Sequence, residues 1–164
     1  SVKAQINVSA VNYLQNGSFE SGDLHSWTVT DHAGADQLYV EQKTADSLTG
    51  DWHMHFWSAK TNTVEFTMEQ EVTNLEAGTY KYSISIMGGD AGDAEVYAYV
   101  KINGEIVKTC PMRITSYGSW DTGTITGIEY AEGDTIVVGI YVRCAGAGNG
   151  AWGKIDDATF NKDI

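Results

Sequence analysis

The chain has 164 residues, enough to bury a substantial core within one domain, and a formal net charge of −12 with only 10 Lys and Arg. Such an acidic balance repels phosphate backbones and anionic bilayers, which argues against nucleic-acid and membrane partners. No apolar run is long enough to cross a bilayer, and the N-terminus lacks a signal-peptide pattern, so we expect a soluble domain cut from a longer chain.

The composition indicates sheet structure, because the chain contains 18 Gly, 9 Tyr and 5 Trp but a single Pro, and no long amphipathic helix is visible. Residues 1–14 are weakly patterned and are predicted to form a linker or an edge strand. Residues 15–164 are predicted to form one β-sandwich module. Residues 16–29 open it with turn residues that alternate with large apolar ones, N-G-S-F-E-S-G-D-L-H-S-W-T-V.

Strand-like alternation of apolar and polar residues recurs along the chain. The clearest such segments are residues 51–58, 63–72, 80–87, 95–102 and 135–144. With the turn signals between them, we predict about eight or nine strands. The sequence therefore predicts an all-β fold, a two-sheet antiparallel β-sandwich of jelly-roll type.

The outward sides of these segments differ. That of residues 63–72 is acidic and typical of a solvated sheet surface. If the other four share a sheet, their outward side chains make one aromatic and hydrogen-bonding face, of the kind that suits sugars. Its members are His53, His55, Trp57, Met87, Tyr97, Tyr99, Tyr141 and Arg143. The alternative is that loops at 88–93 and 145–151 cover these rings.

The last strand, within A-G-A-G-N-G-A-W-G-K-I-D-D-A-T-F at 145–160, contains a conflict of parity. Ile155 and Phe160 have opposite parity, so both can be buried only if the strand is irregular between them, and a bulge is expected at Asp156 and Asp157. A bulge would bring carboxylate and carbonyl oxygens together, as calcium prefers. Alternatively, both carboxylates lie in water at a sheet edge.

Two cysteines, Cys110 and Cys144, each end an apolar run. A disulfide between them and two buried free thiols are both compatible with the sequence, which does not settle the redox compartment.

Several segments together resemble carbohydrate-binding module family 61, over roughly residues 16–162. They are the opening N-G-S-F-E-S-G-D-L-H-S-W-T-V, H-M-H-F-W, L-E-A-G-T-Y-K-Y-S-I-S-I-M-G-G-D, Y-G-S-W and the closing V-V-G-I-Y-V-R-C-A-G-A-G-N-G-A-W-G-K-I-D-D-A-T-F. Such modules accompany endo-β-1,4-galactanases of glycoside hydrolase family 53 and bind β-1,4-galactan. The resemblance implies a secreted or cell-surface bacterial module, monomeric and covalently attached to a catalytic domain.

The resemblance also implies site residues. Glu20 and Asp156 or Asp157 would hold a structural calcium ion, for which carboxylate oxygens are suitable ligands. The residues that would bind carbohydrate are Trp57, Trp120, Trp152, Asn149, Arg143, His55, Tyr141 and Asp90. Asp90 and Asp93 interrupt a loop that is richer in glycine in the family, so the fine specificity does not follow from the resemblance.

An enzymatic function is not expected. The adjacent Asp156 and Asp157 point to opposite sides of a strand and cannot face each other across a cleft, as glycosidase carboxylates do. No G-x-S-x-G, H-E-x-x-H or phosphate-binding loop occurs, and His53 and His55 lack a third ligand for a transition metal. The alternatives are a binder of xylan, mannan or β-glucan, and a structural or adhesive sandwich domain.

Overall fold

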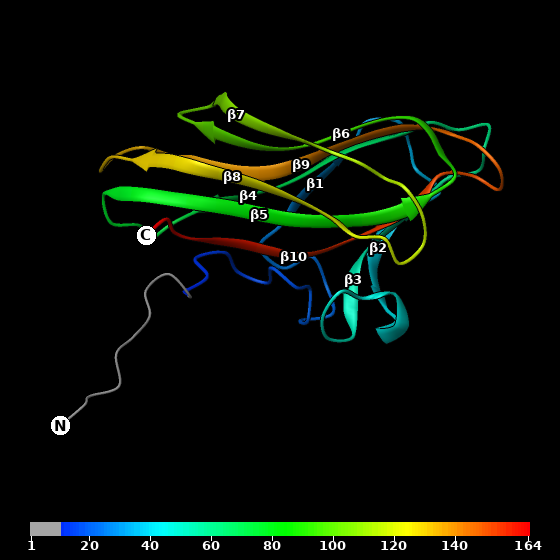
Figure 1. Cartoon of the computed structure of the whole chain (residues 1–164), viewed down its shortest axis with the longest axis horizontal. Coiled ribbons are helices and arrows are strands. Elements are labelled where there is room, and N and C mark those ends of the chain that lie inside the picture. Colours follow the sequence, from blue (N-terminus) through cyan, green and yellow to red (C-terminus); the bar gives the residue numbers. More distant parts are fainter. Residues whose placement is uncertain (1–10) are drawn as a thin grey trace.

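The computed structural model describes residues 11–164, which form two five-stranded antiparallel sheets packed face to face (Figure 1). One sheet has the order β1-β4-β9-β6-β7 and the other the order β2-β3-β10-β5-β8. The strands are β1 (Thr28–Asp31), β2 (Gln37–Gln42), β3 (Trp52–Trp57), β4 (Val64–Val72), β5 (Gly78–Gly89), β6 (Ala91–Ile102), β7 (Glu105–Met112), β8 (Asp121–Tyr130), β9 (Ile136–Gly146) and β10 (Trp152–Lys162). A short 3-10 segment, Thr44–Asp46, follows β2. The predicted all-β jelly-roll sandwich is confirmed.

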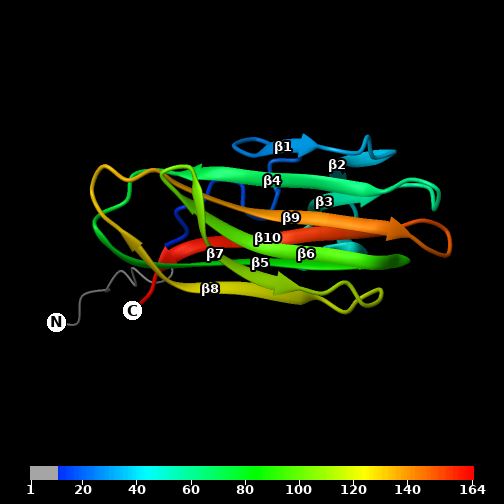
Figure 2. The same cartoon turned by 90° about the horizontal axis from the view of Figure 1, so that it is seen from above.

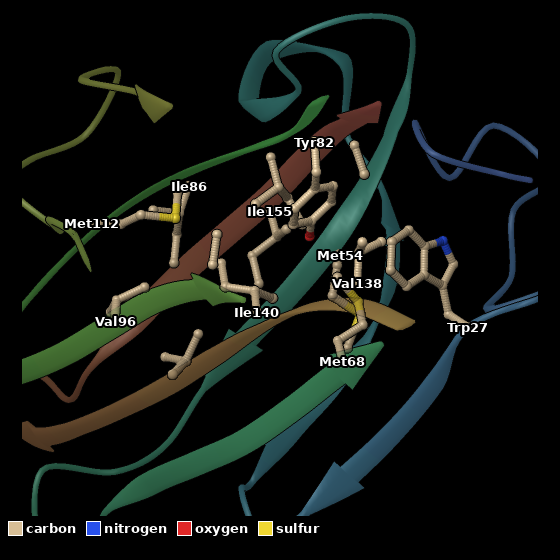
Figure 3. Close-up of a cluster of buried hydrophobic side chains, with 14 of the residues drawn as sticks. Trp27, Met54, Met68, Tyr82, Ile86, Val96, Met112, Val138, Ile140 and Ile155 are labelled. Carbon is tan, nitrogen blue, oxygen red and sulfur yellow. The ribbon is translucent and has the colours of Figure 1, made fainter. Parts of the chain in front are cut away.

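The core lies between the two sheets and is made by the inward-facing side of each alternating strand (Figure 3). Met54 of β3, Met68 of β4 and Ile155 of β10 are completely buried there. Tyr82 of β5 is also buried and donates its hydroxyl to the carbonyl of Gly139 in the opposite sheet, at 3.0 Å. This bond satisfies a polar group that would otherwise be costly to bury.

The condition for a single aromatic face, that the four alternating segments share one sheet, is not met. β3 and β5 belong to one sheet, whereas β6 and β9 belong to the other (Figure 1), and the two sheets overlie each other when seen from above (Figure 2). Alternation along a strand shows which side chains face inward, but it does not show which strand is the neighbour. The aromatic side chains of these strands therefore lie on two opposite outer faces of the sandwich.

The predicted bulge in the last strand is confirmed. Ile155 and Phe160 are both completely buried. The register of β10 against β5 shifts between Asp156 and Thr159, and Asp157 has a positive φ of 54°. The extra residue reverses the parity of the strand, so apolar side chains on both sides of it reach the core.

The segment 11–14 packs beside the last strand. The amide of Tyr13 donates to the carbonyl of Phe160 at 2.8 Å, the side-chain amide of Asn12 donates to the carbonyl of Ala158 at 3.0 Å, and Leu14 is buried. The remainder of the predicted linker or edge strand, residues 1–10, lies outside the described part of the chain.

Both cysteines are free thiols. Cys144 is buried, and burial raises the pKa of its thiol to about 11. Cys110 is half-buried on β7. Within residues 11–164, no helix has the length and apolar character that a membrane span requires.

Candidate functional site

A cavity of about 520 Å³ opens on the outer face of the sheet that contains β2, β3 and β10. It is lined by Gln37, Glu41, Lys43, Asp46, His55, Trp57, Tyr117, Trp152 and Lys154. Strand register explains why these residues meet. Trp57 pairs with both Gln37 and Trp152, and His55 pairs with Lys154. Such side chains lie on one face of neighbouring strands, within contact distance.

Three aromatic rings form the walls. Trp57 and Trp152 come from adjacent strands, whereas Tyr117 comes from the connection between β7 and β8. This connection crosses from one sheet to the other near the end of β5 (Figure 1), where the amide of Gly118 contacts the sulfur of Met87 at 3.3 Å. It thereby brings the Tyr117 ring to within 6.1 Å of the Trp152 ring, centroid to centroid, at an angle of 41°.

The backbone holds both indoles. The Trp57 Nε1–H donates to the carbonyl of Asn149 at 3.1 Å, which ties the ring to the loop before β10. Trp152 lies against Gly89, its partner on β5. A Cβ atom at Gly89 would lie 3.0 Å from the Trp152 Nε1 atom, closer than most Cβ contacts, so a side chain at this position would force the ring to shift.

The polar side of the cavity is organised around Glu41. Its Oε2 atom accepts hydrogen bonds from Lys154 Nζ at 2.5 Å and from His53 Nε2 at 2.7 Å. Although burial acts to raise the pKa of Glu41, the bonds from Lys154 and His53 lower it overall. Glu41 is therefore a carboxylate that is held in place by two donors.

His55 is the second member of this network. Lys154 Nζ lies 2.7 Å from Nδ1 of His55, and Nε2 of His55 lies 2.7 Å from Oε1 of Gln37. Burial, followed by the charge of Lys154, lowers the pKa of His55 to about 4. The imidazole is thus neutral at physiological pH.

Asp46 completes the polar lining. It accepts a hydrogen bond from the Tyr117 hydroxyl at 2.7 Å and forms an ion pair with Lys43 at 3.2 Å. Burial raises the pKa of Asp46, but these two partners lower it overall. The cavity therefore has two carboxylates and two ammonium groups that balance, in a chain whose net charge is −12.

The structure brings some of the predicted binding residues to this cavity. Trp57, Trp152 and His55 line it. Asn149 and Asp90 shape the neighbouring loop instead, because the amide of Asn149 donates to the Asp90 carboxylate at 3.4 Å and the carbonyl of Asn149 holds Trp57.

The other predicted residues lie elsewhere. Trp120 is half-buried directly before β8 and is not part of the lining. Tyr141 and Arg143 are on β9, in the opposite sheet. There the Tyr141 hydroxyl donates to Glu65 at 2.6 Å, and its ring stacks on Tyr97 with centroids 5.0 Å apart. The structure does not bring these three residues to the cavity.

Several lining residues were missed from the sequence. They are Gln37, Glu41, Lys43, Asp46, Tyr117 and Lys154. One signal was available, because Lys154 has the same parity as Trp152 on β10 and therefore faces the same side. The others lie on β2, on the segment that follows it and on the connection after β7, which carry no alternation that points to a site.

The three predicted calcium ligands converge on one loop, residues 47–52. Glu20 accepts hydrogen bonds from the amides of Asp51 and Trp52, both at 2.9 Å. Asp156 is completely buried and accepts from the amide of Leu48 at 2.9 Å. Burial raises the pKa of Asp156 to about 7.

Asp157 reaches the same loop. Its Oδ1 atom accepts hydrogen bonds from the hydroxyl of Ser18 at 3.0 Å and from that of Thr49. These oxygens are of the type that calcium prefers. Nevertheless, within the described residues no three His, Cys, Asp or Glu side chains are grouped closely enough to hold an ion. The donor chemistry fits calcium, whereas the side chains bind amides and hydroxyls in the present arrangement.

Comparisons with known proteins inform the fold. No family model and no curated protein matches the sequence. Among solved structures, the chain is similar to TmCBM61 in complex with β-1,4-galactotriose, with a TM-score of 0.80 and 24% identity over 94% of this chain and 100% of that one.

Two further structures share the fold. One contains the CBM22-1 and GH10 modules of the Clostridium thermocellum endo-1,4-β-D-xylanase 10B with xylohexaose, with a TM-score of 0.58 and 16% identity over 90% of this chain and 28% of that one. The other is a cyclase from Fischerella sp. TAU, with a TM-score of 0.60 and 14% identity over 94% of this chain and 100% of that one. At such identities, similarity establishes the fold. The chain has the jelly-roll β-sandwich fold of carbohydrate-binding modules, and the resemblance to family 61 is confirmed at that level.

Proposed function

We propose that the chain is a non-catalytic carbohydrate-binding module that recognises β-1,4-galactan or galacto-oligosaccharides. The observation that carries the proposal is the cavity in which Trp57, Trp152 and Tyr117 surround a hydrogen-bonding network. Aromatic rings stack on the apolar faces of sugar rings, and polar groups bind the hydroxyl rim. The similarity to a module solved with β-1,4-galactotriose supports galactan as the first ligand to test.

The mechanism that we propose is targeting. Stacking on exposed rings and exchangeable hydroxyl contacts give modest affinity, because each hydrogen bond to the sugar replaces one to water. A catalytic domain attached to the module, such as an endo-β-1,4-galactanase, would then experience a higher effective concentration of polysaccharide. This role is that of a secreted or cell-surface bacterial protein, monomeric in its binding form.

The state of the acidic groups supports binding rather than catalysis. Glycosidases need a carboxylic acid whose pKa is raised so that it can donate a proton. Glu41 and Asp46, the carboxylates of the cavity, both have lowered pKa values because basic and hydroxyl partners stabilise their charged forms. Neither is suited to be a general acid near neutral pH.

The test is calorimetry against β-1,4-galactan, with xylan, glucomannan, β-glucan and polygalacturonate beside it. Trp57→Ala and Trp152→Ala should each weaken galactan binding by about tenfold or more, since stacking area is lost. Trp120→Ala is the matched control, because this residue is outside the cavity, and it should bind like the parent chain.

The outcomes separate the alternatives. Preference for xylan, glucomannan or β-glucan would move the proposal to another neutral glycan. A folded chain that binds none of them would leave a structural or adhesive domain. In that case Trp57→Ala and Trp152→Ala would act mainly by lowering stability.

We also propose that a structural calcium ion binds where Glu20, Asp156 and Asp157 meet the loop 47–52. Each of the three side chains contacts that loop, and no ion pair within the described residues balances their charge. Carbonyls of the loop 47–50 would complete an all-oxygen shell. Chelation should then lower the melting temperature.

A further inference from the structure

Lys154 is a nearly buried lysine in the wall of the cavity, with only 4% of its surface exposed. It lies on β10, two residues after Trp152. A buried ammonium group is unfavourable unless it is paired, so its partners define its role.

The ammonium group of Lys154 contacts three side chains of the protein. It donates to Oε2 of Glu41 at 2.5 Å and to Nδ1 of His55 at 2.7 Å, and it lies 3.7 Å from Oδ2 of Asp46. Lysine has three N–H donors and no acceptor. These three contacts leave Lys154 little capacity to bind a ligand itself.

The hydrogen bond from Lys154 to His55 determines which ring nitrogen of His55 carries the proton. Because Lys154 can only donate, Nδ1 of His55 must be the acceptor, and Nε2 must carry the proton. That proton is donated to Oε1 of Gln37 at 2.7 Å. The carbonyl of Gln37 is thereby engaged, and its amide N–H groups remain as donors at the cavity.

We infer that Lys154 is the positioning residue of the site. It fixes the tautomer of His55 and the orientation of the Glu41 carboxylate. The cavity thereby offers a hydrogen-bond donor at Gln37 and an acceptor at Glu41 to a neutral, hydroxylated sugar. This inference rests on the proposed function. Both lysines of the cavity, Lys43 and Lys154, form ion pairs with carboxylates that also line it. The site is therefore matched to hydroxyl groups rather than to a carboxylated sugar.

The first arm of the test is NMR on the parent chain. Long-range ¹H–¹⁵N spectra report which nitrogen of His55 is protonated, and we expect the Nε2–H tautomer at neutral pH, with protonation only near pH 4. In Lys154→Met the nearby positive charge is gone, so the His55 midpoint should rise by about one pH unit or more. A midpoint unchanged in Lys154→Met would overturn the inference, as would an Nδ1–H tautomer in the parent chain.

Several other ionisable groups lie near His55, and their protonation must be distinguished from its own. Glu41 faces it from β2, His53 lies beside it on β3, and Asp46 and Lys43 approach from the segment after β2. The ring of Tyr39 packs on His55 with centroids 5.1 Å apart. Because the NMR spectra report on the two ring nitrogens of His55 themselves, they distinguish protonation of His55 from protonation of these neighbours.

The second arm is calorimetry with β-1,4-galactotriose. Lys154→Met should bind at least about tenfold more weakly than the parent chain at pH 7, and its affinity should begin to fall at a higher pH as acid is added. Lys101→Met is the matched control, since it removes a lysine paired with Glu69 on the opposite sheet, and it should change neither property. Equal affinity and an equal pH profile in Lys154→Met would overturn the inference.

The two proposals can fail separately. If the parent chain binds no glycan, the proposed function fails, whereas the NMR arm still decides whether Lys154 fixes His55. If Lys154→Met does not fold, Lys154→Gln removes the charge with a smaller loss of polarity, and the tautomer in the parent chain remains decisive.

Discussion

Gly89 shows how a single missing side chain shapes the candidate site. Trp152 lies against its backbone, and a Cβ atom there would come within 3.0 to 3.1 Å of three atoms of the indole. Real Cβ atoms rarely approach so closely, so any larger residue must displace the ring. The position of Trp152 thus depends on the absence of a side chain at Gly89.

We predict that Gly89→Val weakens β-1,4-galactotriose binding by about tenfold, because the displaced indole no longer stacks on the sugar. Gly92→Val is a suitable control, since a Cβ atom there would meet its nearest neighbour, Ala147, at an ordinary 3.6 Å. Calorimetry gives the affinities, and a melting curve confirms folding. Equal binding by both variants would show that Trp152 does not depend on Gly89.

At the scale of the element, β10 connects the cavity to the proposed calcium site. Its first half carries Trp152 and Lys154, and its bulge places Asp156 and Asp157 at the loop 47–52. The positive φ of Asp157, 54°, is what allows the strand to change parity. Asp tolerates this left-handed conformation better than most residues do.

A β-branched residue at position 157 of the bulge should therefore destabilise the protein. Asp157→Val and Asp157→Gly both remove the carboxylate contacts to Ser18 and Thr49, but only valine also adopts the positive φ with difficulty. We expect Asp157→Val to be less stable than Asp157→Gly by about 1 kcal/mol or more. Urea unfolding in the presence of a chelator measures this difference without a metal contribution. Equal stabilities would mean that the bulge conformation is not strained.

At the scale of the whole molecule, the fold brings the opening segment, the loop 47–52 and the last strand together at the proposed calcium site. Glu20, the loop 47–52 and the pair Asp156–Asp157 are distant in sequence yet in contact. A cation there would bind the folded state and not the unfolded chain, so its binding free energy would add to stability.

We predict that excess chelator lowers the melting temperature by about 5–10 °C relative to calcium at about one hundred times its dissociation constant. Differential scanning calorimetry with added calcium, and with magnesium as the control ion, measures the effect. Glu20→Gln should reduce the response to calcium. A melting temperature that is the same with calcium and with chelator would refute the calcium proposal.

The sequence by itself determined the fold class, the inward sides of the strands and the bulge in β10. These are local properties, because alternation with a period of two dictates which side chains face the core, and a change of parity between Ile155 and Phe160 requires an extra residue. It also indicated Trp57 and His55, which lie on a segment with clear alternation, and Trp152 through the resemblance to family 61.

Only the tertiary structure decided which of those faces form a site. Pairing between strands that are distant in sequence placed Tyr141 and Arg143 on the sheet opposite Trp57. It also brought Glu41 of β2 to Lys154 of β10, a contact between residues 113 positions apart. No periodicity along the chain encodes such partners, because they depend on how whole sheets order their strands and where long connections cross between them.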